Sequence, residues 1–85
     1  MDEIIRTVKA YIIEEFLPGE KEDALSDSTP LITGGILDSI STVRLVSLLE
    51  ERYGIEFQAH ELSADYLNSV AAIASTVQAK LGARG

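Results

Sequence analysis

Cysteine is absent from this chain of 85 residues. Without it, the polypeptide supplies no disulfide framework, no thiolate metal site and no thiol nucleophile. Basic residues are also few, because 7 lysines and arginines stand against 14 aspartates and glutamates, for a formal net charge of -7. A field of that sign repels nucleic acid and anionic membranes, and it favours partners with basic surfaces.

Long hydrophobic runs and a basic leader are missing as well. The opening residues Met1-Asp2-Glu3-Ile4 lack the positive region of a secretory signal, and no apolar run approaches the length needed to span a bilayer. Hydrophobic residues still make up 46% of the chain, which argues against disorder. We therefore expect one small domain over residues 1–85, a monomer in the cytoplasm with a single core.

Hydrophobic periodicity predicts an all-α fold, a small bundle of three main helices and one short helix. Ser63 is the expected cap of the short helical turn, and Asn68 or Ser69 that of the last helix. Residues 82–85 are expected to fray. The expected elements are a helix over 2–17, a long loop over 18–38, a helix over 39–53, a short helical turn over 63–67 and a helix over 69–81.

The core is expected to form from one face of each main helix and from apolar side chains of the long loop. Leu25, Leu31 and Ile32 are the residues expected to pin the loop. The expected helical core residues are Ile4, Ile5, Val8, Tyr11, Ile12 and Phe16 in the first helix, Thr42, Leu45, Val46, Leu49 and Tyr53 in the second, and Val70, Ile73, Ala74, Val77 and Leu81 in the last.

The segment from Gly34 to Ile40 sets one serine at the start of the second helix. Gly34 and Gly35 allow a sharp turn, and Asp38 is a favoured N-cap whose carboxylate accepts hydrogen bonds from the first N–H groups. Ser39 then occupies the first helical position, where free N–H groups and the helix dipole favour an anion such as a phosphate ester. We interpret Ser39 as a modified residue that carries a phosphate-linked prosthetic arm, and not as a catalytic one.

The outer side of the second helix carries apolar residues close to that serine. At 100° per residue, Ile40, Val43, Arg44 and Ser47 lie on the side opposite the core. Scattered exposed apolar residues are ordinary in proteins and need no function. Because Ile40 and Val43 lie next to Ser39, we favour a small docking patch, which we assign to Asp38, Ile40, Val43, Arg44 and Ser47.

These motifs resemble the acyl carrier protein superfamily over almost the whole chain. The resemblance rests on the apolar first helix, Thr29-Pro30-Leu31 in the long loop, the run from Gly35 to Ile40, the continuation from Leu45 to Ile55, and Ser69-Val70 at the start of the last helix. It implies that Ser39 holds 4′-phosphopantetheine as a phosphodiester, placed there from coenzyme A by a phosphopantetheinyl transferase with Mg²⁺. The thiol of that arm would carry an acyl or aminoacyl group as a thioester, and the polypeptide itself would catalyse nothing.

The second helix departs from the fatty-acid branch of that superfamily, whose members carry a strongly acidic second helix. Ser41, Arg44 and Arg52 stand where acidic residues are expected, and Ser47 replaces a bulkier apolar residue. The chain looks more like stand-alone aminoacyl, peptidyl or D-alanyl carriers, which are loaded by an adenylate-forming ligase and serve downstream enzymes of specialised metabolite biosynthesis. Two alternative functions stay open, a D-alanyl carrier for cell-wall modification and a fatty-acid acyl carrier.

Two other functions fit the sequence less well. A serine hydrolase built on Ser39 would need a histidine as its base, and the only candidate is His60, the single histidine, in a predicted loop. The Gly-x-Ser-x-Gly motif that presents the nucleophile in many hydrolases is also absent. A helical protein-interaction domain would leave Ser39 as an ordinary helix-start residue, although Asp38 already supplies the cap. The acidic pairs Glu14-Glu15, Glu22-Asp23 and Glu50-Glu51 lack the spacing of a metal-binding loop, so no metal site is expected.

Overall fold

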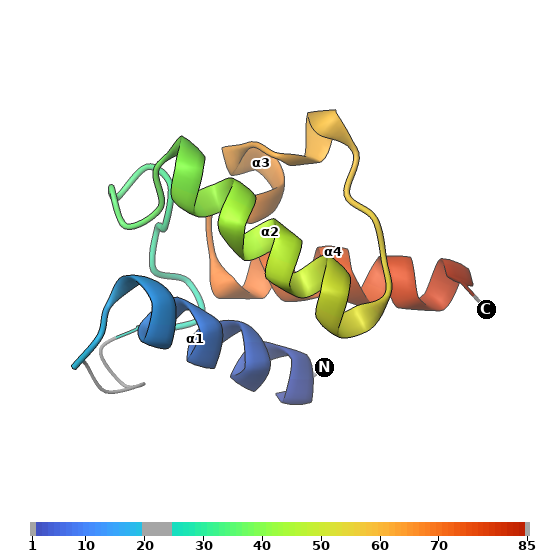
Figure 1. The fold of residues 1–85 in the computed structure, drawn as a ribbon, viewed down its shortest axis with the longest axis horizontal. Helices are drawn as coiled ribbons and strands as arrows, with labels where there is room; N and C mark the ends of the chain where they lie inside the picture. Colours follow the sequence, from blue (N-terminus) through green and yellow to red (C-terminus); the bar gives the residue numbers. More distant parts are fainter. Residues whose placement is uncertain (1, 20–24, 85) are drawn as a thin grey trace.

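A computed structural model describes residues 2–19 and 25–84, which form a helical bundle without strands in these ranges (Figure 1). The all-α bundle with three long helices and a short one is thereby confirmed. Helix α1 packs against both α4 and α2, while α3 packs against α4 and a 3-10 turn, η2. The elements are α1 (Asp2–Phe16), α2 (Ser39–Tyr53), η2 (Ala59–Glu61), α3 (Ala64–Leu67) and α4 (Val70–Arg84).

Helix α2 begins and ends where local signals place it. Its first residue follows Asp38, and Gly54 ends it in the left-handed conformation, with φ 65° and its N–H donating to the Glu50 carbonyl. A left-handed residue after the last turn is the usual role of glycine at a helix C-terminus. Both ends agree with the range expected from the sequence.

The predicted start and end of the last helix need correction. Ser69 is its cap, since the Ser69 hydroxyl accepts from the Ala72 N–H at 3.0 Å, and α4 begins at Val70. The helix continues through Gly82 to Arg84, so the expected fraying is wrong for residues 82–84. Gly85 lies outside the described residues. A glycine in a helix costs only about 1 kcal/mol relative to alanine, too little to stop the last turn.

Ser63 is the N-cap residue of α3, as expected, and the helix itself covers Ala64–Leu67. Its side chain makes no cap hydrogen bond, and backbone bonds from Tyr66 and Leu67 to the Ser63 carbonyl close the turn. The turn η2 was not expected, because three residues carry too little periodicity to be recognised.

The core lies between α1, α2 and α4, and the long loop contributes to it. Leu25 and Leu31 are fully buried and Ile32 is half-buried, as expected of residues that pin this loop. Leu37 and Ile13 were not expected in the core, while the expected Ile5 and Tyr11 are half-buried and pack against it. The reason for the burial of Ile13 is that α1 packs against two helices, so its buried face is wider than the single stripe assumed.

The remaining expected core residues behave as the periodicity indicates, with a gradient toward the helix ends. Phe16, Tyr53 and Leu81 are half-buried and pack against the core. The buried members of the three long helices are Ile4, Val8, Ile12, Thr42, Leu45, Val46, Leu49, Val70, Ile73, Ala74 and Val77.

None of the helices described in residues 2–19 and 25–84 is long and apolar enough to cross a membrane. Of the long loop, residues 20–24 lie outside the described residues, and the pair Glu22-Asp23 falls there.

Candidate functional site

Ser39 is the first residue of α2 and its side chain is exposed. Two residues earlier, Leu37 is buried to 2% relative exposure, and three residues later Thr42 is buried to 7%. The chain is therefore anchored in the core on both sides of Ser39, while the serine itself points away from it. Anchoring of this kind presents the hydroxyl to a second protein without exposing the core.

Asp38 caps α2 through its side chain and its backbone. Its carboxylate accepts from the Ser41 N–H at 2.7 Å, and its carbonyl accepts from the Thr42 N–H at 2.9 Å and from the Thr42 hydroxyl at 2.7 Å. The Ser41 backbone hydrogen bond, followed by that of the Ser41 hydroxyl, holds the pKa of the exposed Asp38 below its usual value. The carboxylate is therefore ionised at neutral pH beside Ser39, and it leaves the serine hydroxyl free of the capping role.

Two glycines shape the turn that leads into the site, each for its own reason. Gly35 has φ +84°, a conformation that residues with a side chain rarely adopt. At Gly34 the limit is space, because a Cβ there would lie 2.2 Å from the Pro30 carbonyl oxygen. Backbone bonds from Ile36 and Leu37 to the Leu31 carbonyl, both 2.9 Å, close the turn.

Asn68, which lies between α3 and α4, holds the same turn through hydrogen bonds. Its side-chain oxygen accepts from the Ile32 N–H at 2.9 Å and the Thr33 N–H at 3.0 Å, and its carbonyl accepts from the Leu31 N–H at 2.6 Å. The sequence suggested only a capping role for Asn68, since nothing in the local pattern signals a bond across 36 residues. The amide thus positions the loop that precedes Ser39.

A groove of about 430 Å³ lies directly beside Ser39. Its floor comes from the buried Leu37 and Thr42, and its far wall from Leu62 and Ser63. The sequence suggested a capping role for Ser63, but it placed neither Leu62 nor Ser63 near Ser39. Among the residues near Ser39, these two come from the segment between α2 and α3. The groove is lined by Ile32, Leu37, Asp38, Ser39, Thr42, Val43, Leu62 and Ser63.

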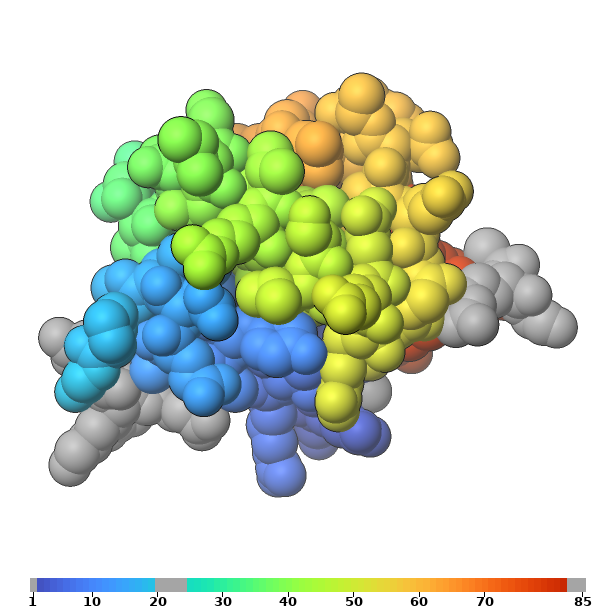
Figure 2. Space-filling view, in the orientation of Figure 1, coloured from blue at the N-terminus to red at the C-terminus, as the bar shows by residue number. Residues whose placement is uncertain are grey.

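The residues expected to form the docking patch are all exposed in the structure. Ile40 is 80% exposed and Val43 54% exposed, the two highest values among the large hydrophobic side chains that the structure describes. Figure 2 shows α2 crossing the front of the molecule between α1 and the segment over 59–67, with no other element covering it in this view. Arg44 pairs with Glu15 of α1 at 3.5 Å, but its side chain stays 66% exposed. Docking by these residues remains a prediction.

His60 lies in η2 and is exposed, with its ring edge-on to Tyr66 at a centroid distance of 5.7 Å. Among the described residues, no hydrogen bond joins its imidazole to the Ser39 hydroxyl. Within the described part of the chain, no three histidine, cysteine, aspartate or glutamate side chains gather in a way that would hold a metal ion.

Comparison with known proteins identifies the segment that contains this site. The model of the family "Phosphopantetheine attachment site" matches residues 11–77, from the middle of α1 to the middle of α4. No curated protein matches the chain. One chain of the solved structure "Crystal structure of FAD-dependent dehydrogenase" is 33% identical with a TM-score of 0.74, and the match covers 82% of this chain and 97% of that one.

Because the family model spans most of the chain, the expected resemblance to acyl carrier proteins is confirmed. Members of the family are generally carriers, and the family is defined by a covalently attached 4′-phosphopantetheine. An exposed serine hydroxyl at a helix N-terminus, beside a groove, is a fitting environment for a phosphodiester and the chain that extends from it. The protein belongs to the phosphopantetheine attachment site family, and its prosthetic group is 4′-phosphopantetheine.

Proposed function

We propose that Ser39 is the attachment residue and that the protein is a non-catalytic carrier of an acyl or aminoacyl group. The observation that supports this most strongly is the placement of Ser39: exposed, first in α2, relieved of capping by Asp38, and inside the segment that the family model matches. A phosphopantetheinyl transferase would join the Ser39 oxygen to the phosphate of the arm, while the nucleotide half of coenzyme A leaves. The terminal thiol of the arm then supplies the thioester chemistry that a chain without cysteine lacks.

Each residue around Ser39 has a distinct part in this proposal. Asp38 orders the first turn of α2 and keeps a negative charge next to the hydroxyl, where a metal-dependent transferase would approach. Gly34 and Asn68 hold the loop, so that the hydroxyl is presented in one position. The groove beside Ser39 offers a path for the arm over Val43 and Leu62.

Loss of the hydroxyl is expected to abolish attachment. Incubation with a promiscuous phosphopantetheinyl transferase, Mg²⁺ and coenzyme A should raise the intact mass of the wild type by one phosphopantetheine. Ser39→Ala should show no rise, while Ser75→Ala, which removes an exposed serine of α4 away from the docking patch and the groove, should be converted fully. An unmodified wild type, beside a known carrier converted in the same tube, would contradict the proposal.

The proposed loading enzyme is an adenylate-forming ligase that transfers an amino acid or a short acid to the arm. Arg44 and Arg52 on α2 support this choice over fatty-acid enzymes, which dock on strongly acidic second helices.

An FAD-dependent dehydrogenase is proposed as a downstream partner of the carrier. The solved structure that contains the similar chain is named as that of an FAD-dependent dehydrogenase. The match covers 82% of this chain and 97% of that one, so the matched chain is itself a small one, of about the size of this protein.

A charge placed in the docking patch is expected to impair loading without unfolding the protein. Val43→Asp adds a carboxylate to a side chain that is 54% exposed, so the core is unaffected while an apolar contact with the ligase is lost. Loading should slow by about tenfold or more, equivalent to about 1.4 kcal/mol. Helix content by circular dichroism should not change. Glu56→Asp, an exposed conservative change outside the patch, should load normally; equal loading of both variants would exclude this surface.

A further inference from the structure

The segment between α2 and α3 forms one wall of the groove at Ser39, although it has little regular structure. Leu62 and Ser63 line the groove, yet residues 54–63 contain only the three-residue turn η2. A turn that short provides few backbone bonds to fix a loop. Backbone bonds tie Ser63 to α3, so the rest of this segment depends on side-chain contacts with the long helices.

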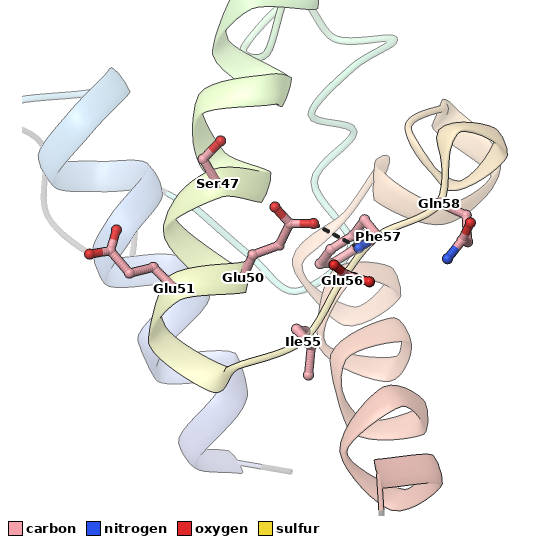
Figure 3. Close-up of a pocket in the computed structure, with 7 residues that line it drawn as sticks. All are labelled: Ser47, Glu50, Glu51, Ile55, Glu56, Phe57 and Gln58. Atoms are coloured by element: carbon pink, nitrogen blue, oxygen red, sulfur yellow. Dashed lines mark hydrogen bonds between the residues drawn. The ribbon is translucent and has the colours of Figure 1, made fainter.

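One contact comes from α2. Glu50 extends from the helix toward the loop, and its carboxylate accepts from the Phe57 N–H at 2.8 Å, as Figure 3 shows. The same view shows Ile55 and Phe57 on the strand-like stretch that leaves α2. Ile55 is buried to 6% exposure. The first half of the segment is thus attached to α2.

The second contact comes from α4 and is centred on Glu61. One oxygen of the Glu61 carboxylate accepts from the Lys80 ammonium at 2.6 Å and from the Gln58 N–H at 2.7 Å. The ammonium also lies 5.2 Å from the centroid of the Phe57 ring, within the range of a cation–π contact. Lys80 therefore contacts two side chains of the loop, Phe57 and Glu61, and Glu61 directly precedes Leu62.

This ion pair is better shielded than the other two found in the described residues. The side chains of Lys80 and Glu61 are 17% and 13% exposed, against 22% and 52% for Lys9 and Asp27 and 66% and 37% for Arg44 and Glu15. Screening by water and salt weakens exposed pairs far more than partly buried ones. The Gln58 hydrogen bond, followed by the Lys80 ammonium, also lowers the pKa of Glu61, so the carboxylate stays charged at neutral pH.

We propose that Lys80 is a positioning residue, which acts through Glu61 to hold the groove wall of Leu62 and Ser63 in place for enzymes that act at Ser39. The inference rests on the proposed attachment at Ser39. Lys80 lies on α4 and does not line the groove, so its influence on Ser39 passes through the loop. Removing its charge leaves a half-buried carboxylate without a cation, and this favours a loop that opens toward water.

The test compares Lys80→Met with Lys80→Arg and with Lys9→Met. Methionine keeps the apolar stem over Phe57 and removes the ammonium, whereas arginine keeps the charge. Lys9→Met removes the same group from the Lys9–Asp27 pair at 2.8 Å, which does not touch the groove. Two quantities are measured for each purified protein: amide hydrogen exchange along the chain, and kcat and KM of arm transfer by a promiscuous phosphopantetheinyl transferase.

Lys80→Met is expected to speed exchange at Phe57, Gln58 and Leu62 while exchange in α1 stays as in the wild type. KM for the carrier should rise about tenfold, equivalent to about 1.4 kcal/mol, with kcat nearly unchanged. Lys80→Arg and Lys9→Met should both resemble the wild type in KM.

An unchanged KM in Lys80→Met, with or without faster exchange, overturns the positioning role, as does an equal rise in Lys9→Met. Unfolding of Lys80→Met would appear as faster exchange in α1, and the same comparison is then made with Glu61→Gln, which weakens the pair but keeps the acceptor for Gln58. Failure of the proposed function is distinguishable, because a wild type that gains no arm gives no KM, while the exchange experiment still shows whether Lys80 orders the loop.

Discussion

Replacing Leu49 with alanine is expected to lower the free energy of unfolding by about 2–5 kcal/mol. Leu49 lies on the inner face of α2 and its side chain has 0% exposure. Alanine leaves a cavity in the core cluster to which Leu49 belongs, and the lost packing adds to the lost hydrophobic transfer energy. Small domains are stable by about 5–15 kcal/mol, so this single change removes a large part of the total.

Thermal unfolding followed by circular dichroism measures this effect. In a domain of this size, each kcal/mol shifts the melting temperature by about 4–8 °C, so a fall of at least about 8 °C is expected. Leu48→Ala removes the same group from the next, half-buried position and should have a clearly smaller effect. Equal shifts in the two variants would mean that the inner face of α2 is wrongly assigned.

Replacing Gly34 with alanine is expected to disturb both stability and arm attachment. The added Cβ would lie 2.2 Å from the Pro30 carbonyl oxygen, and because that atom belongs to the backbone, the turn itself must shift. Overpacking of this kind costs about 1–3 kcal/mol. Since the turn leads into Asp38 and Ser39, the rate of arm transfer should fall as well.

Gly82→Ala is the matched control, because it adds the same methyl group where nothing lies within 4 Å. Within α4, alanine in place of glycine should stabilise the protein by about 0.5–1 kcal/mol. The two substitutions are therefore expected to move the melting temperature in opposite directions, and only Gly34→Ala should slow arm transfer. A stable, fully active Gly34→Ala variant would show that the close approach to Pro30 is not required.

The parts of the fold that the sequence predicts well are those set by neighbouring residues. Asp38 as the cap of α2 and Gly54 at its end depend on bonds within four residues, which cap preferences capture directly. The exposure of Ile40 and Val43 follows in the same way from the 3.6-residue period of one helix. Ser39 could be singled out for this reason, since its place at the start of α2 is set by the neighbouring residues.

The parts that could not be predicted depend on contacts between distant segments. Asn68 looks like a helix cap in the sequence, yet its amide holds Ile32 and Thr33. The pair of Glu61 and Lys80 joins residues 19 positions apart, and two charged residues at that spacing carry no signal of their own. The groove beside Ser39 combines α2 with a loop, so its far wall was equally invisible before the helices were packed together.

Locating the arm within the chain is the most direct test of the attachment at Ser39. The wild type is modified with a phosphopantetheinyl transferase and coenzyme A, digested, and its peptide over residues 31–44 is fragmented in a mass spectrometer. Attachment at Ser39 predicts that every fragment containing this residue, and none lacking it, carries the added phosphopantetheine. Fragments that place the group on Ser41, only two residues further along α2, or a peptide that carries no added mass, would contradict it.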